Sequence, residues 1–276
     1  SGSMLKDTVA PYITSNTSVN SGTRICGQNI NFDVNFNEVV SGANSSRIKL
    51  TFSDSEQNAG NTFANYQSGD NSNRYRYRYT IPNGYIGNGD EDTDGVDHAS
   101  SIDLQGGSIV DVNGNPLAST TLSSTHWASL NIDGIKPVIT GVSTPAPSYN
   151  TYYIGQTMPV SVVYDDIVNV SGANPYIRFQ TFNVNWTSSP QLDYSSGSGS
   201  NTLIFSHTFF NGNQDNNGLN LNSNIQTNNV FDANGNRAYN SLTTTSFPSI
   251  LVDALVPVVT ANTLPDINIA NVNAIT

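Results

Sequence analysis

Residues 90–97 carry five acids in eight positions, in the order Asp90-Glu91-Asp92-Thr93-Asp94-Gly95-Val96-Asp97. Oxygen-bearing side chains at alternate positions, followed by a glycine for a sharp turn, are typical of a calcium-binding loop. We therefore predict a calcium ion held by Asp90, Asp92 and Asp94, with Asp97 as a further ligand. The remaining ligands would be backbone carbonyls, water or a distant acid such as Glu38. The alternative interpretation is an acidic loop that faces solvent.

A less charged copy of this pattern occurs at residues 213–218, Asn213-Gln214-Asp215-Asn216-Asn217-Gly218. It keeps the alternation and the glycine, so Asn213, Asp215 and Asn217 are candidate ligands of a second cation site. Asp166 falls in the place that corresponds to Glu38, and it is the candidate distant acid there. The smaller negative charge predicts that this site binds more weakly or not at all.

Arginines alternate with tyrosines in the segment Arg74-Tyr75-Arg76-Tyr77-Arg78-Tyr79. Successive side chains of a strand point to opposite faces. We therefore expect Tyr75 and Tyr77 in a core, with Arg74, Arg76 and Arg78 in one outward row. This row either pairs with acids on a neighbouring strand or binds an acidic glycan or a partner carboxylate, which a guanidinium matches bidentately. The net charge of −11 argues against nucleic acid as a partner.

Support for catalysis is weak, and we predict that the chain is not an enzyme. The sequence has three histidines but neither the H-E-x-x-H nor the G-x-S-x-G motif. A catalytic triad assembled from distant positions stays open, because triads are defined by geometry. His98 is expected to be exposed in its loop. Of the two tryptophans, Trp127 is expected to pack, and Trp186 is the candidate for stacking on a sugar.

The composition favours an extracellular all-β chain. Only 11% of the 276 residues are charged, and no run of about 18 apolar residues predicts a membrane-spanning helix. The single cysteine, Cys26, excludes an intrachain disulfide and is expected to be a small apolar strand residue. The opening Ser1-Gly2-Ser3-Met4 has the character of an expression remnant, so residues 1–6 are left out and the natural protein is expected to extend upstream.

Several landmarks recur in the same order about 120 to 130 residues apart, which indicates an internal duplication. The recurring pairs include Asp7-Thr8-Val9-Ala10-Pro11 with Asp133-Gly134-Ile135-Lys136-Pro137, Val40-Ser41-Gly42 with Val170-Ser171-Gly172, Tyr66-Gln67-Ser68-Gly69 with Tyr194-Ser195-Ser196-Gly197, and Asp111-Val112-Asn113-Gly114-Asn115 with Asp232-Ala233-Asn234-Gly235-Asn236. We therefore predict a first copy at residues 7–132 and a second copy at residues 133–252. Residues 253–276 begin a third copy or form a terminal strand.

Alternation of apolar and polar residues predicts strands within each copy, as in Ile30-Asn31-Phe32-Asp33-Val34-Asn35-Phe36. Short alternating segments separated by Gly, Asn, Asp, Ser and Pro indicate a β-sandwich. The two Asp-x-Asn-Gly-Asn segments predict tight turns, with a share in a cation site as the other interpretation. Asp133 and Asp253 precede a proline at each predicted boundary, where they either cap a turn or bind a cation that stiffens the linker.

The second copy contains Tyr194-Ser195-Ser196-Gly197-Ser198-Gly199, then Asp215 with Gly218-Leu219, then Asp232 with Asn234-Gly235-Asn236. From residue 7 to about 253 the chain resembles the tandem immunoglobulin-like, loosely cadherin-like repeats of large bacterial surface and secreted proteins. The resemblance implies two tandem immunoglobulin-like β-sandwich domains that act as spacer and adhesion modules at the cell surface. Their partners would be other repeats of the same chain and a cell-surface glycan or protein. The alternative is a carbohydrate-binding module of an extracellular protein.

Overall fold

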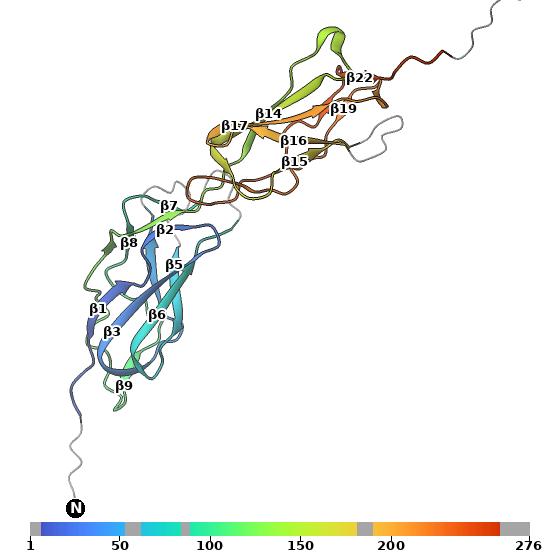
Figure 1. Ribbon diagram of the computed structural model, residues 1–276. Helices are drawn as coiled ribbons and strands as arrows, with labels where there is room; N and C mark the ends of the chain where they lie inside the picture. Colours follow the sequence, from blue (N-terminus) through green and yellow to red (C-terminus); the bar gives the residue numbers. More distant parts are fainter. Residues whose placement is uncertain (1–6, 53–61, 84–88, 181–189, 260–276) are drawn as a thin grey trace, which may run out of the picture.

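The computed structural model describes residues 7–52, 62–83, 89–180 and 190–259, which form an all-β structure with several sheets (Figure 1). A short 3-10 turn, η1 (Ser148–Asn150), is the one helical element within these ranges. No helix found there has the length and apolar character that a membrane crossing needs. The strand-rich class predicted from the alternation is therefore confirmed.

The first copy contains a large sheet and a small one. Its strands are β1 (Ile13–Ser18), β2 (Gly22–Ile25), β3 (Asn29–Gly42), β4 (Arg47–Thr51), β5 (Phe63–Ser68), β6 (Ser72–Thr80), β7 (Glu91–Asp92), β8 (Val96–His98), β9 (Ile109–Asp111), β10 (His126–Trp127) and β11 (Leu130–Asp133). The large sheet runs β1-β3-β6-β5-β4-β8-β10, with β9 paired to β3. The small sheet runs β2-β11-β7, and β2 and β11 are parallel.

The second copy repeats this order of strands. They are β12 (Ile139–Ser143), β13 (Thr151–Tyr153), β14 (Thr157–Val170), β15 (Tyr176–Arg178), β16 (Gln191–Ser196), β17 (Ser200–Thr208), β18 (Asn213–Asp215), β19 (Leu219–Asn220), β20 (Val230–Phe231), β21 (Ser246–Phe247) and β22 (Leu251–Ala254). The sheets are β12-β14-β17-β16-β15 with β20 on β14, β13-β22-β18 with a parallel β13–β22 pair, and β19-β21.

Equivalent residues meet across equivalent strands. Tyr66 lies opposite Tyr77 in the β5–β6 pair, and Tyr194 lies opposite Phe205 in the β16–β17 pair. The ladder of β3 with β6 is interrupted just before Val40, and the ladder of β14 with β17 is interrupted in the same way. The duplication inferred from the landmarks is therefore reproduced in the strand pairing.

One predicted match between the copies is wrong by two residues. Val40 lies opposite Ser72, whereas the valine opposite the equivalent Ser200 is Val168 and not Val170. The pairing with the next strand shows the same offset, because Gly42 lies opposite Ile109 and Val170 lies opposite the equivalent Val230. Gly42 and Gly172 both have positive φ, at 92° and 89°, so the turn requires a glycine wherever it begins.

Each copy has its own hydrophobic core. In the first, Phe32, Ile48, Tyr75, Tyr77 and Leu130 are fully buried; in the second, Val160, Ile177, Leu203, Phe205 and Leu219 are. Burying a large apolar side chain contributes roughly 1.5–3 kcal/mol. Figure 1 shows the two sets of sheets placed end to end in an elongated molecule.

The recurring Ser-Gly segments form the turns of the hairpins that join β5 to β6 and β16 to β17. Gly69 has φ +119° and Gly197 has φ +108°, and a Cβ on either would lie 2.0 Å from a backbone oxygen. The hydroxyl of Tyr66 accepts a hydrogen bond from the backbone N–H of Asp70, and Tyr194 does the same for Ser198. Each turn is therefore built from a glycine that tolerates the conformation and a tyrosine that binds its backbone.

Candidate cation site and the junction between the copies

The acidic loop at residues 90–97 places its carboxylates in different environments. Asp90 and Asp92 are fully buried, whereas Asp94 and Asp97 are exposed. The Tyr79 hydroxyl donates a hydrogen bond to Asp90, and Asp92 Oδ1 accepts one from the N–H of Gly95 at 3.0 Å. Asp97 Oδ1 lies 2.9 Å from His126 Nδ1. Asp92 thus acts as the cap of the turn at Gly95.

Gly95 and Gly218 explain why the pattern recurs. A Cβ on Gly95 would lie 2.6 Å from Ala128 Cα, and one on Gly218 would lie 2.4 Å from Pro248 Cα. Asp215 is buried like Asp92, and its Oδ1 accepts a hydrogen bond from the N–H of Asn217. The carboxylate and the glycine together build a tight turn against the turn that follows β10 or β21, which is a structural reason for the shared spacing.

The two asparagines of the second pattern differ in their surroundings. Asn213 is buried, and its Oδ1 accepts a hydrogen bond from the N–H of Phe210, while Asn217 is exposed. Burial raises the pKa of Asp215, although its hydrogen bonds to backbone N–H groups act in the other direction. Asp215 Oδ2 has no hydrogen-bond partner among the described residues.

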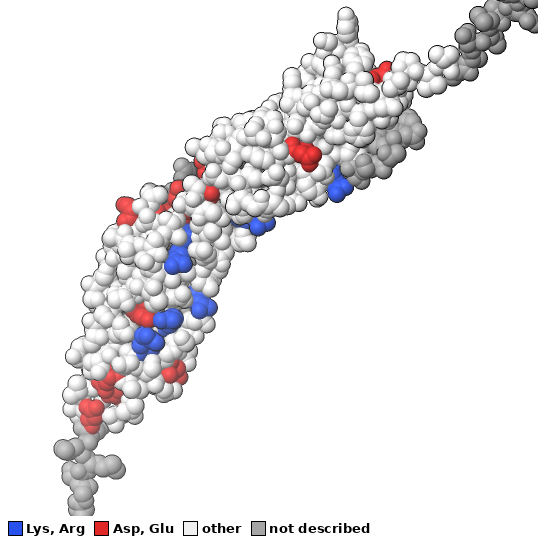
Figure 2. Space-filling model, viewed as in Figure 1, with Lys and Arg blue, Asp and Glu red and all other residues white. Residues whose placement is uncertain are grey.

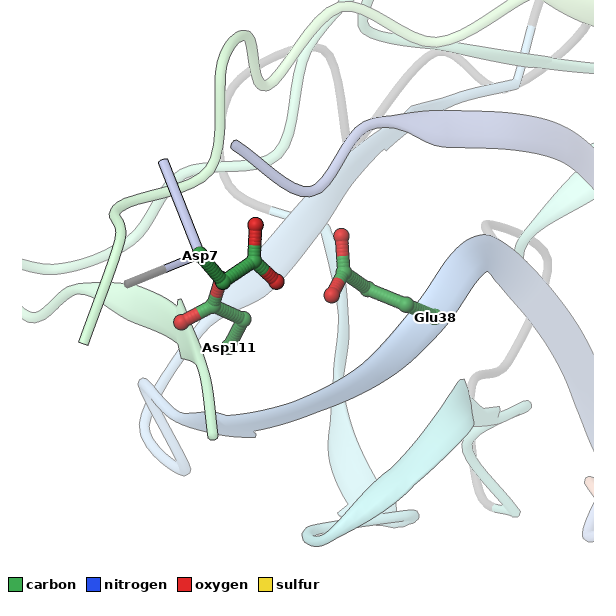
Figure 3. A group of neighbouring side chains, drawn as sticks. All are labelled: Asp7, Glu38 and Asp111. Atoms are coloured by element: carbon green, nitrogen blue, oxygen red, sulfur yellow. The ribbon is translucent and has the colours of Figure 1, made fainter. Parts of the chain in front are cut away.

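Among the described residues, the acids that lie close enough in a group of three to share a metal ion are Asp7, Glu38 and Asp111 (Figure 3). Their carboxylate oxygens lie within 4.8 Å of one another. Asp7 precedes β1, Glu38 belongs to β3, and Asp111 ends β9, which pairs with β3. We call these three residues the acidic trio.

Glu38 therefore lies at a different end of the first copy from the one we predicted. The strand β9 is at the end nearest the N terminus, whereas β7, which belongs to the 90–97 loop, is at the end next to the second copy (Figure 1). The predicted approach of Glu38 to that loop is wrong, because the long strand β3 carries it away from β7.

Hydrogen bonds hold Asp111 in its ionised form. Its Oδ1 accepts hydrogen bonds from the N–H groups of Asn113 and Asn115, and its Oδ2 accepts one from the Asn115 side chain at 2.7 Å. Burial alone would raise the pKa of Asp111, but these hydrogen bonds outweigh it and leave the pKa below its ordinary value. The predicted tight turn at Asp111-Val112-Asn113-Gly114-Asn115 is confirmed, and it also positions a carboxylate of the acidic trio.

The second copy places Asp133, Asp166 and Asp232 at the equivalent positions. Asp232 Oδ1 accepts hydrogen bonds from three successive backbone N–H groups, those of Asn234, Gly235 and Asn236. The pKa of Asp133 is raised, first by burial and then by the negative charges of Asp232 and Asp166, while a hydrogen bond from Asn234 opposes the rise. This mutual repulsion lies at the boundary between the copies, where a cation would relieve it.

The same turn of the second copy fastens onto the first. Asn236 is 1% exposed; its side chain accepts a hydrogen bond from the N–H of Cys26 at 2.9 Å and donates one to the backbone oxygen of Asp133. The Cys26 thiol donates to the backbone oxygen of Gly134 at 3.1 Å. Cys26 follows β2 in a turn, so the prediction of a strand residue is wrong for it.

The arginine row lies on the outer side of β6 as predicted, with Tyr75 and Tyr77 buried beneath it. Arg76 makes two hydrogen bonds to Asp33 on β3, at 2.7 and 2.8 Å, and Arg74 lies 3.6 Å from the same carboxylate. Arg78 Nε donates to Asn31. Arg74 and Arg76 are therefore paired with an acid on the neighbouring strand.

Two of the aromatic and histidine candidates, Trp127 and His98, are packed in the first copy. Trp127 is buried, stacked between Phe32 at 4.0 Å and His98 at 3.8 Å, which confirms its packing role. His98 is buried, so the prediction that it is exposed is wrong. Trp186 lies outside the described residues.

Sequence reasoning missed the acidic trio because its members are far apart in the chain. The available signal was the recurrence of an acid at each of its three positions in the second copy.

Comparison with protein-family models and with curated proteins found no match to this chain.

Proposed function

We propose that the chain is a pair of tandem immunoglobulin-like β-sandwich domains, residues 7–132 and 133–252, of a bacterial cell-surface or secreted protein. In this proposal the domains act as spacer and adhesion modules rather than as an enzyme. Two copies of one eleven-strand arrangement, each with a separate core, support it. Residues 253–259 continue from the last strand of the second copy just as residues 133–139 continue from that of the first. This arrangement fits a repeated unit.

One observation carries the spacer role, namely the side chain of Asn236. It is buried at the junction and bridges the first copy, through the N–H of Cys26, to the segment that links the copies, through the oxygen of Asp133. A free linker between independent domains would leave such a side chain exposed. The junction is therefore expected to hold the two copies at one angle.

Residual dipolar couplings of backbone N–H bonds test this expectation. We expect one alignment tensor to fit both copies in the unaltered chain and two different tensors to be needed in Asn236→Ala. The matched control is Asn115→Ala, which removes the equivalent side chain within the first copy and should leave the relative orientation unchanged. Two independent tensors in the unaltered chain would contradict the spacer role.

Calcium is the cation that we propose for these domains, with the acidic trio as its site. Carboxylates and backbone oxygens are the ligands that calcium takes in flexible geometry, whereas magnesium requires a smaller octahedron and keeps its waters. Few protein ligands predict modest affinity, on the order of 10⁻⁴–10⁻³ M, as in extracellular modules. Asp133, Asp166 and Asp232 occupy the equivalent positions of the second copy but do not lie close enough together to form such a group, so we propose no ion there.

Thermal unfolding during a calcium titration tests the cation site. At ten times the Kd, a cation that binds only the folded chain stabilises it by about 1.4 kcal/mol. We expect Glu38→Gln to remove most of the rise in melting temperature that belongs to the first copy. The control Asp94→Asn alters the exposed acid of the 90–97 loop and should keep that rise. Loss of the rise in the control and not in Glu38→Gln would instead assign the calcium to the loop.

A further inference from the structure

The first copy carries a positively charged surface that the rest of the chain does not share. Five of the ten Lys and Arg residues project outward from two strands of one sheet, namely Arg47 and Lys49 on β4 and Arg74, Arg76 and Arg78 on β6. The whole chain has a net charge of −11. Figure 2 shows Lys and Arg side chains gathered on one face of the first copy. We call this surface the basic face.

Two of these arginines flank a groove with a volume of about 610 Å³, lined in part by Arg47, Phe63, Asn65, Gln67, Arg78 and Thr80. The strand register places Arg47 opposite Asn65, and Asn65 opposite Arg78. The two guanidinium groups therefore rise from strands on either side of β5, about 10 Å apart at the backbone. The exposed Asn65 lies between them.

Both guanidinium groups keep donors available for a ligand. Arg47 stacks over the Phe63 ring, 3.7 Å from its centroid, and its Nε donates to Asp103. Arg78 uses its Nε for Asn31, and no other hydrogen bond from it is found within the described ranges. A guanidinium has five N–H donors, so each arginine can still offer the paired terminal N–H groups that bind a carboxylate.

The second copy shows that the fold does not require these charges. In the equivalent row, Tyr176 lies opposite Asp193, and Asp193 lies opposite Ser206. Tyrosine and serine thus replace the two arginines, and an acid replaces Asn65. The second copy forms the same strand pairing with two uncharged residues and one acid in this row. The two arginines of the first copy are therefore not needed for folding, which indicates a separate role at the surface.

We propose that this groove binds a saccharide that carries carboxylate groups, such as a uronic-acid oligosaccharide. Arg47 and Arg78 would bind carboxylates, while the amides of Asn65 and Gln67 and the hydroxyl of Thr80 would bind sugar hydroxyls. An acidic peptide would also match the charges but carries fewer hydroxyl groups for this row of exposed amide and hydroxyl groups, and the polyglutamate control below distinguishes the two ligand classes. The inference deepens the adhesive part of the proposed function and depends neither on the spacer role nor on calcium.

Binding of a galacturonate tetrasaccharide to the full chain, followed by NMR chemical shifts in EDTA, tests the proposal. EDTA keeps the result independent of any cation site. We expect shifts at the groove residues and a Kd that rises with salt, because screening weakens exposed charge pairs. The double variant Arg47→Tyr/Arg78→Ser introduces the second copy's own residues, so it should fold normally and bind at least about tenfold more weakly.

Three controls decide between ligand classes. Arg237→Ala removes a positive charge that lies at the junction and does not line the groove, so it should bind as the unaltered chain does. The methyl-esterified tetrasaccharide should bind at least about tenfold more weakly, since its carboxylates are capped. Equal binding of the ester, equal binding of a short polyglutamate, or unchanged binding by the double variant would each overturn the proposal, as would an absence of shifts at the groove.

Discussion

His98 is a buried titratable residue, and the equivalent residue of the second copy is the apolar Leu221. His98 lies opposite Leu50 on β4, and the equivalent Leu221 forms a bridge with Phe179. Its ring stacks on Trp127, and its Nε2 lies 3.3 Å from Asn16 Nδ2. Burial lowers the pKa of His98, against smaller effects of the Ala99 carbonyl and Asp97 that raise it.

This lowered pKa predicts a loss of stability in mild acid. The unfolded chain takes up a proton at His98 below about pH 6.5, whereas the folded chain still holds the ring neutral. The contribution of His98 to stability is therefore present above about pH 6.5 and is lost as the pH falls toward the folded pKa. In His98→Leu, we expect a smaller drop in the urea midpoint between pH 7.5 and pH 5.5.

A second, half-buried histidine limits the size of the expected change. His207 also has a pKa lowered by burial, so part of the pH dependence should survive in His98→Leu. An identical drop in the unaltered chain and in His98→Leu would show that the buried ring is not its source.

At the scale of an element, the hairpin of β16 and β17 depends on Gly197. Its φ of +108° is unfavourable for other residues, and a Cβ there would lie 2.0 Å from the backbone oxygen of Thr202. We expect Gly197→Ala to lower the free energy of unfolding by about 1–3 kcal/mol or more. Urea unfolding followed by circular dichroism measures the loss.

Gly141→Ala is the matched control for that hairpin. Gly141 lies in β12 of the same copy, where a Cβ would meet the Val163 side chain at an ordinary distance of 3.8 Å. The control is expected to change the free energy of unfolding by less than about 1 kcal/mol. A similar effect of both substitutions would mean that the turn geometry of Gly197 is not the cause.

The strands were more predictable than the candidate cation site. Alternation in Arg74–Tyr79 correctly assigned the faces of β6, because burial of Tyr75 and Tyr77 determines the register of a strand. Alternation in Asp90–Asp94 did not predict where those carboxylates lie, because Asp92 serves as a buried turn cap. The spacing of residues within a segment predicts which face of a strand each side chain occupies. It does not predict which other segments contact that side chain.

The acidic trio illustrates the remaining limit. Asp7, Glu38 and Asp111 meet because β9 pairs with β3, a contact between residues about 70 apart in the chain. No local pattern predicts such a pairing. Comparing the two copies would have found it, since Asp133, Asp166 and Asp232 recur together with the strands that carry them.

At the scale of the whole molecule, the two ends of the second copy differ in what covers them. Ile135 and Lys136 are half-buried at the junction, whereas the equivalent Leu255 and Val256 are 45% and 52% exposed. Ile154 corresponds to Cys26 and is 50% exposed. Within the described ranges, the far end of the second copy therefore repeats the junction positions in an exposed state.

Hydrogen exchange tests this equivalence. The N–H of Cys26, bound by Asn236, should exchange slowly, and the N–H of Ile154 should exchange fast. In a longer chain with a further copy of residues 133–252 joined after residue 252, we expect Ile154 to become protected. Protection of Ile154 that does not change on extension would show that the end is not a second junction.

The parallel pairing of β2 with β11, and of β13 with β22, has a mechanical consequence. Tension on the two ends of a copy would pull these paired strands in opposite directions along their length. All the hydrogen bonds between them would then bear the load together in shear, whereas a hairpin pulled open from one end breaks its bonds one at a time. Several such copies joined in series would therefore resist extension, because the parallel strands of each copy lie along the direction of the pull.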